Sequence, residues 1–143
     1  GMAFEDAPRA LIIGADEVKA LEMKEQFKLL SRETDLRAEL AFDGGKIDAQ
    51  TEAIYFGTDI VIGTAKRVLE IYFRKNFKLN KIKLFVIDDA EKIIKNALHG
   101  QIDRLALSLP KCQHLVFTND LTPKIEKLIE KFIIAPTIVE VEA

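Results

Sequence analysis

The chain has 143 residues, 48% of them hydrophobic and 31% charged, a balance that is typical of one globular domain and excludes a disordered chain. The formal net charge is −2, from 21 basic and 23 acidic residues, so any nucleic-acid binding is expected to be weak or shared with another module. Cys112 is the only cysteine, and His99 and His114 lack partners at zinc-ligand spacing, so neither a disulfide nor a zinc site is expected. Without a long apolar run or a signal-peptide pattern, we expect a cytoplasmic protein with no membrane partner. Gly1, before Met2, is interpreted as a residue left by tag cleavage, and the domain is expected to cover residues 2–143.

In the first half of the chain, short apolar runs alternate with helical patterns. Strands are expected at Ala10–Ile13, Ala38–Phe42 and Asp59–Ile62. A first helix, capped by Asp16, is expected from apolar residues near helical spacing, namely Val18, Leu21, Met23, Phe27 and Leu30. A second helix is expected at Ile47–Tyr55, and a third after the cap residue Thr64, carrying Val68, Leu69 and Tyr72.

The second half continues the alternation. A buried strand is expected at Leu84–Asp88, and a helical pattern that begins at Glu91 is expected to run towards Leu109, before Pro110. Further strands are expected at Gln113–Phe117 and Thr137–Val141, and between them a helix from Pro123 with an apolar face of Ile125, Leu128, Ile129 and Phe132. This order predicts an α/β fold of three layers, with a mostly parallel sheet and helices on both faces.

The acid pair Asp88-Asp89 follows a buried strand directly, and two interpretations stay open. Ligands of open α/β sheets bind outside the carboxyl ends of the strands, so the pair is a candidate site. Alternatively, Asp88 is an N-cap and Glu91, three residues later, completes a capping box.

Common catalytic motifs are absent from the sequence. No G-x-x-x-x-G-K-[ST] phosphate loop and no G-x-S-x-G nucleophile motif occur in the 143 residues. The fragments Gly44-Gly45-Lys46 and Gly63-Thr64 are each more typical of a turn.

The order of the segments that end the strands is more informative. Gly44-Gly45 comes first, followed by Thr64-Ala65-Lys66-Arg67, Asp88-Asp89-Ala90-Glu91 and Thr118-Asn119-Asp120. From about Pro8 onward, this series resembles the first of the two RecA-like domains of the DEAD-box ATP-dependent RNA helicases. The resemblance implies a RecA-like sheet that lacks the family's first strand.

The resemblance implies nucleotide-side roles for four residues. In the family's Asp-Glu-Ala-Asp motif, the first Asp holds magnesium, a role that falls to Asp88 through water, and the Glu orients the attacking water. Here Asp89 replaces that Glu, Glu91 replaces the last Asp, and Thr118 keeps one hydroxyl of the family's Ser-Ala-Thr motif. Because Asp89 is one methylene shorter than Glu, we expect it to position water poorly.

Four other residues match nucleic-acid contacts of the family. Gly44 and Gly45 match its glycine pair, and Thr64 and Arg67 match the ends of its Thr-Pro-Gly-Arg motif. Glu17 stands where the family has an arginine that contacts RNA.

The family's Q motif and phosphate loop come before the position of Pro8, and this sequence contains neither. We therefore expect a degenerate domain that binds no cofactor by itself, uses ATP and Mg only if a phosphate loop is supplied elsewhere, and acts as a weak single-stranded RNA-binding or regulatory module. Two alternatives remain: a fragment of an active helicase whose phosphate loop lies outside this chain, and a protein-interaction domain that uses neither ligand. The missing strand predicts a gap or a newly adjacent strand pair beside Thr137–Val141, and hence either a rearrangement of the strands or a homodimer through the unpaired sheet edge.

Overall fold

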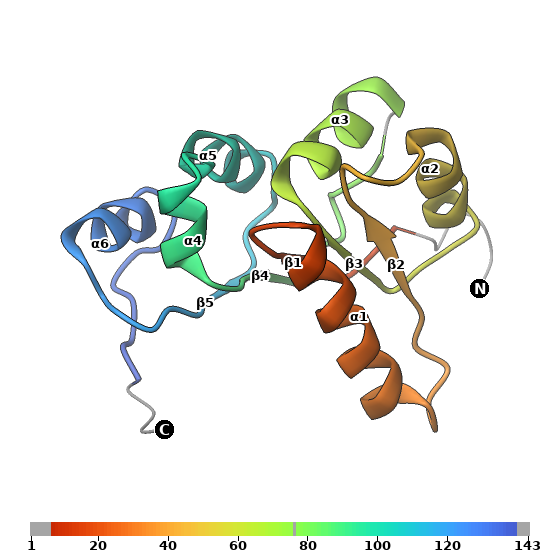
Figure 1. The fold of residues 1–143 in the computed structure, drawn as a ribbon, viewed down its shortest axis with the longest axis horizontal. Coiled ribbons are helices and arrows are strands. Elements are labelled where there is room, and N and C mark those ends of the chain that lie inside the picture. The colour runs from red at the N-terminus through yellow and green to blue at the C-terminus, as the bar shows by residue number, and fades with distance from the viewer. Residues whose placement is uncertain (1–6, 76, 140–143) are drawn as a thin grey trace.

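The computed structural model describes residues 7–75 and 77–139, in which five strands alternate with six helices (Figure 1). The strands are β1 Ala10–Ile13, β2 Ala38–Ala41, β3 Ile60–Gly63, β4 Leu84–Ile87 and β5 Gln113–Val116. The helices are α1 Glu17–Ser31, α2 Ile47–Tyr55, α3 Ala65–Lys75, α4 Ala90–Lys95, α5 His99–Leu107 and α6 Pro123–Glu130. Each of these strands lies within one residue of its expected bounds.

The five strands form one parallel sheet in the order β2-β3-β1-β4-β5. Ile13, the last residue of β1, is opposite Gly63 on one side and Ile87 on the other. The strands therefore all end at one edge, here called the carboxyl edge, and all begin at the opposite amino edge. This register confirms the predicted parallel α/β sheet.

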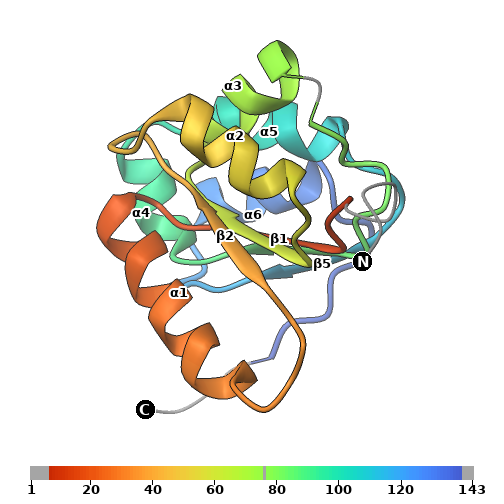
Figure 2. The same cartoon turned by 90° about the vertical axis from the view of Figure 1, so that its right-hand side faces the viewer.

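Helices lie on both faces of the sheet, with α2, α3 and α5 on one face and α1 on the other (Figures 1 and 2). The main core lies under the first group, where buried strand residues such as Leu11 and Phe85 belong to the same cluster as Val68, Ile102 and Leu105. This arrangement confirms the three-layer fold.

Helix α1 exists as expected, but most of its apolar residues do not form a buried face. Ala20 is its one buried residue, whereas Val18 and Leu30 are 64% and 86% exposed. The helix contacts β2 and β3, so only part of it meets the sheet. Periodicity alone does not show how much of a helix a neighbour covers.

The single helix expected from Glu91 towards Leu109 is wrong, because the structure divides it into α4 and α5. Ala97 adopts a left-handed φ of 58°. The amide of Leu98 donates to Ile93 O and that of Ala97 to Ile94 O, which is the Schellman pattern that ends a helix. Glycine is the usual residue at this position, so an alanine gave no sequence signal for the break.

The sixth strand expected at Thr137–Val141 is not formed over residues 137–139, and residues 140 and 141 lie outside the described ranges. Ala135 takes a left-handed φ of 50° immediately before Pro136, which turns the chain at this point. The described sheet has no internal gap, since every neighbouring pair of strands is hydrogen-bonded, and β2 and β5 are its edges. The expected gap is therefore wrong for the described residues. In the same ranges, no helix combines the length and apolar character that crossing a membrane would require.

Candidate functional site at the carboxyl edge

The structure brings all eight candidate residues to the carboxyl edge, in two groups. The glycine-loop group contains Gly44, Gly45, Thr64 and Arg67, together with Asp43. The acid group contains Asp88, Asp89, Glu91 and Thr118. Helix α1 begins between them, because Glu17 packs against Gly44 and Lys19 pairs with Asp88.

Arg67 holds the glycine loop in place from inside the protein. Its side chain is buried, and Nη1 donates to Gly45 O at 2.7 Å and to Gln50 Oε1 at 2.9 Å. Nη2 donates to Asp43 O at 3.0 Å, and Nε lies 3.5 Å from the Glu70 carboxylate. The planar guanidinium suits this fork of acceptors. The Arg67 guanidinium, which the sequence predicted to contact nucleic acid, is therefore hydrogen-bonded to the loop instead.

Thr64 and the two glycines complete this loop. The buried Thr64 hydroxyl donates to Asp43 Oδ1 at 2.7 Å. A Cβ on Gly44 would collide with the Glu17 carboxylate, and a Cβ on Gly45 would collide with the Gln50 amide. A side chain at either position would therefore have to displace the end of a neighbouring side chain, Glu17 or Gln50. The carboxylate of Glu17 covers one member of the predicted RNA-binding pair.

Asp89, not Asp88, caps helix α4, so the predicted capping box is wrong. The amide of Asp88 still bonds to Ile13 O, which extends the pairing of β4 with β1 by one residue. The chain turns at Asp89, whose φ is 59°, and its Oδ1 accepts from the Lys92 amide at 3.2 Å. The Asp88 carboxylate instead lies 3.6 Å from Lys19 Nζ.

Glu91 connects α4 to the loop after β5. Its Oε1 accepts from the amides of Asn119 at 2.6 Å and Asp120 at 2.8 Å, and lies 3.2 Å from the Thr118 hydroxyl. Ala90 N also donates to Phe117 O at 3.0 Å. Sequence reasoning placed Glu91 and Thr118 in one site but missed the two amides, because every residue carries such a donor.

Two lysines that the sequence did not single out pair with carboxylates at this edge. Besides the Lys19–Asp88 pair, Lys92 Nζ lies 2.6 Å from Asp16 Oδ2. Asp16 also caps α1 by accepting from the Lys19 amide. The hydrogen bond from Lys92 holds the pKa of the Asp16 carboxyl below its usual value.

A cavity of about 280 Å³ lies between the start of α1 and the start of α3. Its charged lining consists of the carboxylates of Asp16, Glu17 and Asp43 and the ammonium of Lys66. Because three anionic groups face one cation, the net charge of the lining is negative, which disfavours the binding of a phosphate group.

The acid group alone does not fit a resident magnesium ion. Asp88 supplies one carboxylate, which faces Lys19, whereas magnesium prefers six oxygen ligands in octahedral geometry. Over residues 7–75 and 77–139, no three His, Cys, Asp or Glu side chains converge as a metal site.

Comparison with known proteins gives the family. Residues 3–128 match the model of the DEAD/DEAH box helicase family. The chain is 31% identical over 138 residues to ATP-dependent RNA helicase RhlB of Pasteurella multocida, and 29% identical over 131 residues to ATP-dependent RNA helicase eIF4A of Eremothecium gossypii. These alignments cover 94% and 91% of the chain but 33% of each relative, so the chain spans about a third of their length.

Solved structures agree on the fold. A DEAD box protein from Methanococcus jannaschii matches with a TM-score of 0.84 and 21% identity, over 89% of this chain and 35% of that protein. The dbp5 chain of S. cerevisiae, from a complex with gle1 and ip6, matches with a TM-score of 0.82 and 22% identity, over 99% of this chain and 36% of that protein. The chain therefore belongs to the DEAD/DEAH box helicase family, and it forms the first RecA-like domain that the order of its strand-end motifs indicates.

Proposed function

We propose that this domain binds single-stranded RNA weakly and does not hydrolyse ATP by itself. The observation that carries the proposal is that the chain's own groups engage every carboxylate of the acid motif. Asp88 faces Lys19, Asp89 caps α4, and Glu91 binds the loop after β5. The three carboxylates of the acid motif thus stabilise the fold in this structure.

The 143 residues by themselves also contain no phosphate-loop motif and so supply none of its contacts to ATP. A phosphate loop supplies several charge-assisted hydrogen bonds, each contributing about 1.5 to 3 kcal/mol. Losing three of them removes roughly 5 to 9 kcal/mol, which is more than three decades of affinity at about 1.4 kcal/mol per decade. Asp88, already paired with Lys19, cannot offset that loss.

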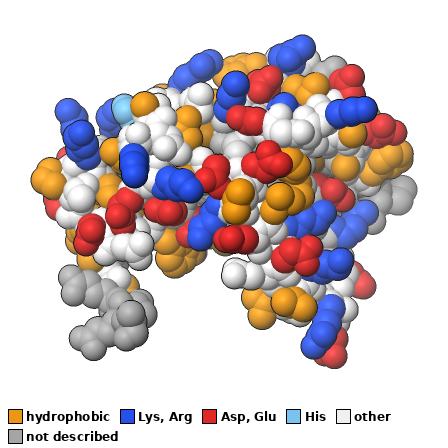
Figure 3. Space-filling view, viewed as in Figure 1, with side chains coloured by type: hydrophobic (Ala, Val, Ile, Leu, Met, Phe, Trp, Pro, Cys, Tyr) orange, Lys and Arg blue, Asp and Glu red, His pale blue; other side chains and the backbone are white. Residues whose placement is uncertain are grey.

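Weak RNA binding is supported by the layout of the carboxyl edge. The glycine loop lies beside the start of α3, where helix amides favour a phosphate and Lys66 is exposed. Glu17 and Asp43 oppose this with two carboxylates in the same cavity. Acidic and basic side chains are interspersed on the described part of the face that carries α1 and α4, where Figure 3 shows no continuous basic surface.

Hydrolysis is tested by measuring phosphate release from ATP with magnesium, with and without single-stranded oligouridylate. We expect no turnover above a protein-free blank. Magnesium-dependent turnover that Asp88→Ala abolishes would overturn this part of the proposal.

RNA binding is tested by fluorescence polarisation with labelled oligouridylate. Glu17→Gln removes a carboxylate from the cavity and should tighten binding about threefold, whereas Lys66→Ala should weaken it about threefold. Glu25→Gln and Lys28→Ala, two exposed positions further along α1, are the matched controls and should change nothing. If Glu17→Gln and Lys66→Ala behave like their controls, RNA does not bind at this edge.

A second candidate is a fragment of an active helicase, which is favoured by the coverage of one third of each relative. In that case the rest of the polypeptide supplies a phosphate loop and, with it, ATP and magnesium binding. Sequencing the gene upstream of Met2 decides between the two, because a phosphate loop encoded there would restore the nucleotide site.

A homodimer through the sheet edge and a cytoplasmic location stay predictions. For the dimer, the structure offers β5, which among the described strands pairs only with β4 and has Leu115 and Phe117 exposed beside it.

A further inference from the structure

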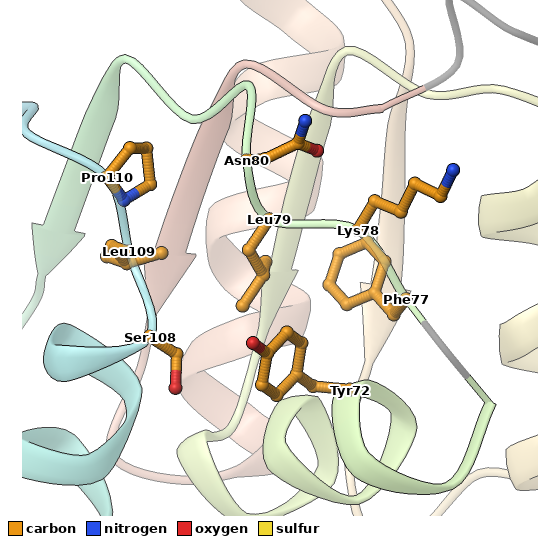
Figure 4. A pocket seen from close by; sticks show the side chains of 8 residues that line it. All are labelled: Tyr72, Phe77, Lys78, Leu79, Asn80, Ser108, Leu109 and Pro110. Carbon is orange, nitrogen blue, oxygen red and sulfur yellow. The ribbon is translucent and has the colours of Figure 1, made fainter.

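A cavity lies at the amino edge, away from the candidate RNA site. It has a volume of about 540 Å³ and lies between the end of α3, the chain from Phe77 to Asn80, and the end of α5 (Figure 4). This volume is within the usual range for a binding pocket. Since a strand of four residues spans about 13 Å, both edges can be occupied at once.

The floor of this cavity is apolar. Phe77 and Leu79 are buried, and Leu109 and Pro110 are half-buried. Figure 4 shows the Leu79 side chain pointing towards Tyr72 in the cavity, whereas the Lys78 ammonium points away from it. The floor therefore suits a bulky apolar group, with a cation at the rim.

The segments that line the cavity are rich in lysine: Lys78 is a lining residue, and Lys81 and Lys111 directly follow the lining residues Asn80 and Pro110. No acidic residue occurs from position 71 to 87, a segment with five basic residues. The side chains of Lys78, Lys81 and Lys83 are exposed, as is that of Lys111, which follows Pro110. Gln113 N donates to Lys83 O, which holds the segment containing Lys111 beside Lys83. Within the described part of the chain, none of these four lysines forms an ion pair.

Exposed lysines thus lie close together near the amino-edge cavity, although the net charge of the chain is −2. We propose that the amino-edge cavity is a docking site for an acidic segment of a partner protein that inserts one bulky apolar side chain. Charge complementarity selects the acidic flanks, and the phenyl and aliphatic floor selects the anchor. A nucleic acid is the less suitable occupant, because its bases prefer exposed aromatic faces and Phe77 is buried.

The test uses three fluorescein-labelled peptides and fluorescence polarisation. The probe has the sequence Asp-Glu-Asp-Leu-Phe-Asp-Glu-Asp; one control replaces Leu-Phe by Gly-Ser, and the other replaces every acid by Ser. We expect the probe to bind at least about tenfold more tightly than either control, and its affinity to fall with added salt. Equal binding of all three peptides would overturn the proposal.

Protein variants locate the site. Lys78→Glu with Lys81→Glu should weaken probe binding about tenfold or more, and the matched exposed charge reversal Lys28→Glu on α1 should leave it unchanged. Asn80→Trp, at an exposed lining position, should block the cavity and abolish binding of the probe. Urea unfolding of each variant confirms that it is folded. Probe binding that survives both the charge reversals and Asn80→Trp excludes this cavity.

Labelled oligouridylate serves as the competing ligand. We expect it not to displace the probe, and we expect its own affinity to be unchanged by Lys78→Glu with Lys81→Glu. If it displaces the probe and loses affinity in this variant, the patch binds nucleic acid and the proposal fails. The RNA site at the carboxyl edge is judged separately, by Glu17→Gln and Lys66→Ala.

Discussion

Asp89 meets two demands that few residues meet together. Its φ of 59° and ψ of 64° lie in the left-handed region, and its carboxylate caps α4 through the Lys92 amide. Asp and Asn tolerate this conformation better than other non-glycine residues, and both are good N-caps. This turn therefore favours an aspartate at position 89.

Two substitutions of Asp89 should therefore distinguish the effects of its backbone conformation and helix cap from the effect of its charge. Asp89→Ala loses the cap and keeps an unfavourable backbone, so the free energy of unfolding should fall by about 1 to 2 kcal/mol. Asp89→Asn keeps both properties and should cost less than about 0.5 kcal/mol. Urea unfolding monitored by circular dichroism measures both, and equal losses in the two variants would contradict the assignment.

Arg67 is the second residue whose structural role can be measured. Arg67→Lys keeps the charge but cannot reach Gly45 O, Gln50 Oε1 and Asp43 O together, so the free energy of unfolding should fall by about 2 kcal/mol. The exposed neighbour Lys66→Arg is the control and should be neutral. Unchanged stability of Arg67→Lys would show that the fork of hydrogen bonds is dispensable.

At the scale of elements, Glu91 joins helix α4 to the loop after β5 across 28 and 29 residues of chain. Glu91→Ala leaves the amides of Asn119 and Asp120 without their acceptor and should cost about 2 kcal/mol, while Glu91→Gln should cost about half as much because one oxygen remains. Hydrogen exchange of those two amides should accelerate in both variants, more in Glu91→Ala. Exchange as slow as in the wild type would mean that other groups hold the loop.

At the scale of the whole molecule, the stability should depend on pH through His114. Its half-buried ring lies 5.8 Å from that of Phe85 and 5.4 Å from that of Phe132, and burial lowers the pKa of the imidazole, although a hydrogen bond at Cys112 partly opposes this. A lowered pKa means that the unfolded chain binds the proton more readily than the fold does. The contribution of His114 to stability is then fully present above the unfolded pKa of about 6.5, and it is lost as the pH falls from that value towards the lower folded pKa.

The free energy of unfolding should thus begin to fall as the pH drops towards about 6.5 and continue to fall until the pH is below the lowered folded pKa of His114, and His114→Phe should flatten this part of the profile. The lowered pKa of Asp16 should reduce the free energy of unfolding in a separate pH range, as the pH falls below the usual carboxyl pKa of 3.8. Urea unfolding across the pH range measures both effects. An equally steep slope in His114→Phe would assign the pH dependence to another group.

Self-association is the other property of the whole molecule that can be tested. If the free edge of β5 pairs with a second copy, sedimentation velocity should show a dimer whose fraction rises with concentration. Leu115→Lys places a charge beside that edge, where Leu115 is 38% exposed, and should shift the protein to monomer. A wild-type protein that stays monomeric at all concentrations would contradict the dimer.

The sequence by itself determined the positions of the five strands to within one residue, because each lies in a short segment between turn residues, although a similar segment at residues 137–139 forms no strand. It determined as well that the sheet is parallel, because helices separate the strands. It also determined that Gly44, Thr64, Asp88 and Thr118 lie at one edge, since the carboxyl ends of parallel strands coincide.

Only the tertiary structure decided what these residues do there. Lys19 faces Asp88, Glu17 covers Gly44, and Glu91 binds Asn119 and Asp120, each contact joining segments that are far apart in the chain. The exposure of α1 and the position of Lys78 at the amino-edge cavity depend in the same way on which elements pack together. Periodicity and caps report interactions within a turn or two of chain, whereas pairs between distant segments exist only once the sheet has set their separation.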